Sequence, residues 1–347
     1  MKRHIASSLL LAATLSGTTQ AQDTTSSYQA PEPIELRAIY AESAIRAGAE
    51  GWVLVHFMVG IDGKVFEPRI VGSSGPEMFQ FAALRALDES TFKPATVGGE
   101  AVEGRSSINF RFLLIDGDKA AGTRFGRLYR NLSTLIESGN KDEAQSLLVT
   151  MNKRGALNNY EGALLALANY MYLGSFSEDI EGQVTYLNQA LMYEAYAPEL
   201  DDSEGYLPED LANTARLDLL TLLIKTKRYA EALNVYRQLQ ESGIDTQVFA
   251  PAIAQIQKIR SDSSAYRVQA RTDTNGSWQI QLFKPGIFID SSGQSVNEFG
   301  LWCEKKYQFF TFQEGNEYQI PESWGNCTLI VMGSPEATFE LEQFGLQ

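Results

Sequence analysis

The side chains that most often perform catalysis or bind metals are scarce in this sequence. Its 347 residues include two histidines, His4 and His56, and two cysteines, Cys303 and Cys327. A Ser or Cys nucleophile needs a base within hydrogen-bond reach, and a zinc ion needs several Cys or His ligands. The sequence also lacks the glycine-rich loop that cradles phosphates. We therefore predict that the protein is not an enzyme, binds no metal and uses no cofactor.

The other groups that could do chemistry are interpreted as ordinary surface or packing residues. His56 alternates with Leu54 and Met58 in an apolar stretch, so we interpret it as a packed or half-exposed side chain. The acidic run ELDDSEG, residues 199–205, lacks the glycine and the spacing of a calcium loop, which predicts a solvated loop. Paired-carboxylate hydrolysis stays open because acidic residues are abundant, but no motif indicates it.

The N-terminus predicts an exported protein. Residues 1–21 have a basic start at Lys2 and Arg3, a short apolar run, and small residues before a cleavage site after Ala21. That run is short for a membrane span, which takes about 20 residues. We therefore predict a cleaved signal and a periplasmic protein; the alternative is an uncleaved anchor in the inner membrane. Residues 22–33 are polar and contain proline, which predicts a mobile linker.

Charge and cysteine content agree with this location. The net charge of −14 argues against nucleic acid and anionic lipid as partners. Membrane contact is therefore expected to be indirect unless the signal is uncleaved. Export to an oxidising compartment predicts a disulfide between Cys303 and Cys327. Two buried free thiols are the alternative.

Residues 34–116 predict a compact unit with the order helix, strand, strand, helix, strand. Asp62-Gly63 predicts a two-residue type I′ turn between the first two strands, because both of its central residues need positive φ. The first strand has two apolar faces, one with Val53, Val55, Phe57 and Val59 and the other with Trp52, Leu54, His56 and Met58.

The rest of the chain predicts two further domains, so the fold class is multidomain α+β. Residues 123–262 have the periodicity of helical hairpins, and residues 265–347 alternate with period two, which predicts a small all-β domain. The middle hairpin is rich in tyrosines, which either line a groove or, as we favour, pack one hairpin on another. They are Tyr160, Tyr170, Tyr172, Tyr186 and Tyr193.

Several motifs of the first unit resemble, in order, those of the TonB C-terminal domain family of energy transducers. They are YAESAIRAGAEGWV, VGIDGKV, VGSSG, AALRAL, FKPATVGGEAV and INFRF, within residues 33–113. Ala41 and Gln80 depart from the Pro and Asp that are common in the family, and the long proline-rich rod of a full transducer is missing. The helical hairpins of residues 123–262 resemble degenerate tetratricopeptide repeats, whose concave face often holds peptides.

The first resemblance implies a three-stranded antiparallel sheet with two helices that holds a short segment of an outer-membrane transporter by strand addition. Within it, Asn109 and Arg111 either contact partner side chains or only solvate the outer face. The implied partner-binding edge is the last strand: Ser106, Ser107, Ile108, Asn109, Phe110, Arg111, Phe112, Leu113 and Leu114.

We therefore expect a periplasmic protein-binding protein associated with outer-membrane transport. The alternative is an envelope assembly scaffold or a TPR-type adaptor that binds no transporter. Under this alternative, the first domain packs against its neighbours, and the helical stack is the expected cover of the apolar second face of the first strand, with Trp52, Leu54 and Met58.

Overall fold

The structure is a computed structural model that describes residues 28–36, 42–114, 120–156, 158–193, 206–293 and 296–345. The predicted signal, its cleavage site and the acidic run 199–205 lie outside these residues. Within the ranges described, no helix is both long enough and apolar enough to cross a bilayer.

The first domain is built on a three-stranded antiparallel sheet in the order β4-β3-β8. β3 (Gly51–Val59) is central, and β4 (Val65–Ser73) and β8 (Gly104–Phe112) flank it. Helix α2 (Met78–Asp88) covers one face of the sheet, where its Phe79 stacks on Phe112 with 4.1 Å between ring centroids. The face under α2 includes the predicted stripe Val53, Val55, Phe57 and Val59.

The turn between β3 and β4 differs from the predicted type I′ turn. Only Gly63 of the Asp62-Gly63 pair has a positive φ, 77°. The Gly63 N–H donates to the Gly60 carbonyl at 2.9 Å, and the Gly60 N–H donates to the Lys64 carbonyl at 2.8 Å. The loop is therefore longer, with a left-handed glycine after a tight turn. A Cβ at Gly63 would lie 2.3 Å from the Phe92 carbonyl oxygen, so packing as well as φ requires glycine.

The segment before the first domain also differs from expectation. Two strands, β1 (Tyr28–Gln29) and β2 (Glu32–Glu35), lie in the region for which a mobile linker was predicted over 22–33. β1 pairs with β6 (Ala95–Val97), and β2 pairs with β5 (Thr91–Lys93). The return segment of the domain thus pairs with main-chain groups that were expected to bond to water in a polar, proline-containing linker. Strand β7 (Glu100–Val102) completes the small β1-β6-β7 sheet.

Of the first helix predicted for residues 34–116, the structure describes α1 (Glu42–Arg46). The helical region follows, and consecutive helices pack against each other. Its elements are α3 (Thr123–Glu137), α4 (Lys141–Arg154), α5 (Asn159–Phe176), α6 (Ile180–Leu191), α7 (Glu209–Lys225), α8 (Tyr229–Glu241), η1 (Gln247–Phe249) and α9 (Ala250–Ser261).

Two four-stranded antiparallel sheets form the C-terminal domain, in the orders β10-β15-β12-β13 and β14-β11-β16-β9. Rings from the two sheets meet between them: Trp278 contacts Phe339 with 5.2 Å between centroids. The disulfide between Cys303 and Cys327 confirms the prediction. The strands are β9 (Tyr266–Arg271), β10 (Ser277–Gln281), β11 (Gly286–Asp290), β12 (Val296–Cys303), β13 (Tyr307–Thr311), β14 (Glu317–Gln319), β15 (Cys327–Gly333) and β16 (Thr338–Phe344), and η2 (Glu322–Trp324) precedes β15.

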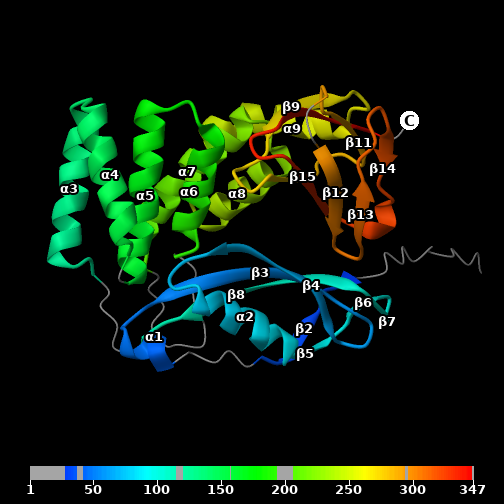
Figure 1. The fold of residues 1–347 in the computed structure, drawn as a ribbon. Helices are drawn as coiled ribbons and strands as arrows, with labels where there is room; N and C mark the ends of the chain where they lie inside the picture. Colours follow the sequence, from blue (N-terminus) through cyan, green and yellow to red (C-terminus); the bar gives the residue numbers. More distant parts are fainter. Residues whose placement is uncertain are drawn as a thin grey trace, which may run out of the picture.

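The second face of the first-domain sheet is covered by the later parts of the chain (Figure 1). At one end of β3, the Trp52 ring meets the edge of Tyr193, which follows α6, with 5.9 Å between centroids. At the other end, Met58 packs against Trp302 of β12 and Ile330 of β15. The sheet is therefore an inner layer, with α2 below it in Figure 1 and the helices and the β sandwich above it.

Candidate functional site

The predicted partner-binding strand, β8, is an edge strand of its sheet. In an antiparallel pair, the main-chain groups of alternate residues point toward the neighbouring strand. The Ser74 N–H donates to the Trp52 carbonyl, so the even-numbered residues of β3 point toward β4 and the odd-numbered ones toward β8. Phe110 lies opposite Val53, so the even-numbered residues of β8 bond to β3. The main-chain groups of the odd-numbered residues therefore point away from the sheet.

The middle of this edge is open. Among the described residues, the outward main-chain groups of Ser107, Asn109 and Arg111 have no hydrogen-bond partner. The Ser107 side chain is exposed, and those of Asn109 and Arg111 are half-buried. Unpaired N–H and C=O groups in a row are what an added strand uses.

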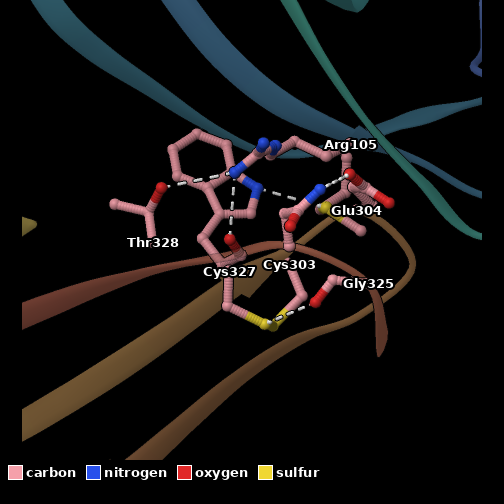
Figure 2. The surroundings of a disulfide bond; sticks show 9 residues. Arg105, Cys303, Glu304, Gly325, Cys327 and Thr328 are labelled. Carbon is pink, nitrogen blue, oxygen red and sulfur yellow. Dashed lines mark hydrogen bonds between the residues drawn. A yellow bond between two sulfur atoms is a disulfide. The ribbon is translucent and has the colours of Figure 1, made fainter. Parts of the chain in front are cut away.

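One end of the edge is already occupied. The Arg105 N–H donates to the Glu304 carbonyl oxygen at 2.7 Å, so the loop after β12 occupies this position of the edge. The Arg105 guanidinium donates to the Trp302 carbonyl at 3.1 Å and to the Thr328 hydroxyl at 3.3 Å. Figure 2 shows these contacts next to the disulfide. An added strand therefore meets the β sandwich at Arg105.

The other end of the edge adjoins the helical region. Arg111 and Leu113 line a small cleft with Met192 and Tyr206. Burial lowers the pKa of Arg111, and a negative charge on Tyr206 would oppose that shift. Arg111 has no acidic partner in the described part of the chain.

Beyond the end of β8, a carboxylate joins the first domain to the helices. The Leu114 N–H donates to Glu50 Oε1 and the Asn159 N–H to Glu50 Oε2, both at 3.1 Å. Asn159 is the first residue of α5, where main-chain N–H groups lack partners within the helix. Glu50, which is 6% exposed, therefore fixes the start of α5 relative to the end of β8.

The predicted edge residues thus fall into two groups. Ile108, Phe110 and Phe112 point into the core under α2 and contribute only their backbone to the sheet. Asn109 and Arg111 lie on the opposite face, where Asn109 Oδ1 is buried and has no hydrogen-bond partner. Both side chains are half-buried.

His56 lies on the covered second face, packed against the β sandwich. Its ring meets that of Trp302 edge-on, with 4.9 Å between centroids. Burial, and then the positive charge of Arg105, lower the pKa of His56 to about 4. A histidine held neutral beside a cation is a packing residue, in agreement with the interpretation from sequence.

Two contacts of this edge could not be found from sequence. Glu304 acts through its main-chain carbonyl, which any residue type has, and Tyr206 follows the acidic run without a motif. The apolar second face of β3 was the signal available, since it required a cover. Over the residues described, no group of three or more His, Cys, Asp or Glu side chains is arranged to hold a metal ion.

The comparisons with known proteins address the first domain. Residues 37–114 match the family model described as Gram-negative bacterial TonB protein C-terminal. The chain is also similar to the solution NMR structure of the Pseudomonas aeruginosa TonB CTD, with 24% sequence identity over 25% of this chain and 88% of that chain, and a TM-score of 0.23. No curated protein matches the chain. The family is associated with energy transduction for transport in the cell envelope. Residues 37–114 are therefore similar to the C-terminal domain of TonB.

Proposed function

We propose that this protein is a periplasmic binding protein that captures an extended segment of an outer-membrane transporter by adding it as a fourth strand beside β8. The observation that carries this proposal is the row of unpartnered main-chain groups on Ser107, Asn109 and Arg111. The match of residues 37–114 to the TonB C-terminal family model supports the class of partner. The role is binding, without catalysis.

The added segment is short, because the edge is bounded at both ends. Glu304 occupies the main-chain N–H of Arg105, and Tyr206 lies beside Arg111. Main-chain bonds supply the affinity, and the half-buried side chains of Asn109 and Arg111 contact the segment's side chains on the covered face.

A proline at position 109 tests the proposal. The Asn109 N–H points away from β3, so Asn109→Pro removes a donor for the added strand without removing a bond of the sheet. We expect Asn109→Pro to weaken binding of a transporter peptide by about tenfold, since one main-chain bond and the strand's fit are lost. Asn109→Ala, which keeps the N–H, is the matched control and should bind within about threefold of the original protein.

Amide exchange on the original protein provides an independent readout. Transporter peptides should slow exchange at Ser107, Asn109 and Arg111 and leave the amides of Ile108 and Phe110, which bond to β3, unchanged. Equal peptide binding by both variants at position 109, or no peptide-dependent protection along β8, would exclude strand addition at this edge.

A second function, an assembly scaffold that binds no transporter, is favoured by a different observation. The second face of the sheet is packed against the chain's own helices and β sandwich, and one position of the edge is occupied by Glu304. Under this alternative, the outward amides of β8 exchange at the same rate with and without transporter peptides. The same exchange experiment therefore separates the two functions.

A further inference from the structure

The two sheets of the C-terminal domain end in four edge strands, β10, β13, β14 and β9. Three of these edges are short or already engaged. β14 has only three residues. On β10, the N–H groups of Ser277 and Gln281 donate to carboxylates of neighbouring segments. On β9, the Arg267 carbonyl accepts Lys227 Nζ at 3.0 Å. Occupied groups and charged side chains of this kind keep an edge from pairing with another chain.

The fourth edge, β13, is open along its length. The Phe312 N–H donates to the Asn297 carbonyl, so the even-numbered residues of this strand bond to β12. The main-chain groups of Tyr307, Phe309 and Thr311 therefore point away from the sheet. Among the residues described, their one partner is the side chain of the preceding glutamine, which donates to the Phe309 carbonyl at 3.0 Å. A carbonyl oxygen has two lone pairs, so this acceptor keeps one free.

The sequence of β13 carries none of the features that protect an edge strand. Residues 307–312, YQFFTF, contain no charge, proline or glycine and are rich in residues that favour strands. Both faces of the strand are packed: the Phe310 ring stacks on Phe299 with 5.0 Å between centroids, and the Arg69 guanidinium lies 4.8 Å from the centre of the Phe309 ring. The strand is therefore held in an extended form in which only its edge is free to bind.

The charges at the two ends of β13 indicate what pairs with it. Lys305 and Lys306 precede the strand, and Glu314 follows it. Lys306 forms no ion pair within the part of the chain that the structure describes. Glu314 accepts the N–H and the hydroxyl of Ser291, and a carboxylate has further acceptor positions. An antiparallel copy of this strand meets each end with the opposite charge, whereas a parallel copy meets like charges.

One antiparallel alignment satisfies both the charges and the main chain. With Lys306 opposite Glu314 of a second copy, Phe310 lies on the two-fold axis and Phe309 lies opposite Thr311. The last two residues both have outward main-chain groups, so they form a hydrogen-bonded pair. We propose that two copies of this chain associate through β13 as a two-fold symmetric dimer, in which two four-stranded sheets join into one of eight strands. Because the shared strand is short, the dimer is expected to form in the micromolar range.

Sedimentation velocity of the purified full chain over a concentration series tests this interface. We expect a shift from monomer to dimer as the concentration rises, without larger species, because a two-fold interface closes on itself. Thr311→Pro removes an outward donor and no bond of the sheet, and symmetry removes it twice, so the dissociation constant should rise by at least about tenfold. Thr311→Ala keeps the N–H and is the matched control, which should dimerise within about threefold of the original protein.

Charge variants test the alignment. Lys306→Glu and Glu314→Lys each place like charges opposite one another at both ends of the shared strand, so each variant alone should dimerise more weakly. An equal mixture of the two restores opposite charges at both ends and should regain dimerisation. A monomer at every concentration, dimers that Thr311→Pro does not weaken, no recovery on mixing, or growth beyond a dimer would each overturn the proposal. Strand addition at β8 is measured with transporter peptides, and Thr311→Pro should leave that binding unchanged.

Discussion

At the scale of single residues, the proposed function depends on main-chain groups more than on reactive side chains. Arg105 illustrates this: its N–H bonds to the Glu304 carbonyl, while its guanidinium binds another carbonyl, that of Trp302. Sequence reasoning identified His56 as a packing residue, because its neighbours at alternate positions are apolar. It did not find the role of Glu304, because a carbonyl oxygen leaves no signature in the residue type.

His56 makes stability depend on pH. Its pKa is about 4 in the folded chain against about 6.5 in the unfolded chain, so the unfolded state takes up a proton first as the pH falls. The contribution of His56 to the unfolding free energy is therefore complete above about pH 6.5. It falls by at most about 3 kcal/mol as the pH drops from about 6.5 to 4.

Urea unfolding at several pH values checks this prediction. His56→Gln lacks the titrating group, so the difference in unfolding free energy between the two proteins should change across this interval and be constant above it. The carboxyl groups titrate equally in both proteins, so their contribution cancels from the difference in unfolding free energy. A difference that does not vary with pH would contradict the burial of a neutral His56.

At the scale of elements, the disulfide and the start of β8 form one structural unit. Cys303 and Cys327 lie directly opposite each other on β12 and β15, with 3.9 Å between their Cα atoms. The three residues that hold Arg105 are their immediate neighbours, Trp302, Glu304 and Thr328. The disulfide therefore fixes the position of the groups that occupy one end of the edge.

Replacing both cysteines by serine should weaken this unit. The chain-entropy model gives a loss of about 3 kcal/mol in unfolding free energy for a loop of this size. We also expect faster amide exchange at Arg105, since its acceptor on Glu304 becomes mobile. The original protein treated with reductant should reproduce both effects, and unchanged protection of Arg105 would show that the disulfide does not position this contact.

Most elements of the first domain were predictable, but their loops and terminal strands were not. The alternation in β3 and the stripe of α2 come from local burial, which sequence periodicity reports. The turn at Asp62-Gly63 was wrong in type because Gly63 must pass close to the Phe92 carbonyl, a contact between distant parts of the chain. Strands β1 and β2 were missed for the same reason, since their partners lie more than 50 residues away.

At the scale of the whole molecule, the first-domain sheet joins the other two domains. Trp52 belongs to the core of the helical region, and Met58, on the same strand, contacts Trp302 and Ile330 of the β sandwich. The sequence showed that this face needed a cover, but which domain supplies which part follows only from the three-dimensional arrangement. The helices and the β sandwich cover the second face of the sheet but leave the middle of β8 and a cavity beside α5 open.

Trp302 tests this arrangement. Its ring is 1% exposed and its Nε1 donates to the Met58 sulfur at 3.2 Å. Trp302→Ala should reduce the unfolding free energy by about 3–5 kcal/mol and speed amide exchange in β3 as well as in β12. Trp324→Ala removes a half-buried ring of the same sandwich that does not contact β3, so it should leave exchange in β3 unchanged. If Trp302→Ala affects β12 alone, the two domains do not stabilise each other.

The occupied position at Arg105 has a consequence for which molecules the edge accepts. From Ser107 to Arg111, a fourth strand gains roughly 17 Å of contact before it reaches a neighbouring part of the protein at either end. A flexible tail can enter this gap and turn outward at both ends. The edge strand of a large folded sheet would collide with the Glu304 loop or with Tyr206. The edge is therefore accessible to a short, flexible segment and protected from the edge-to-edge aggregation to which exposed edge strands are prone.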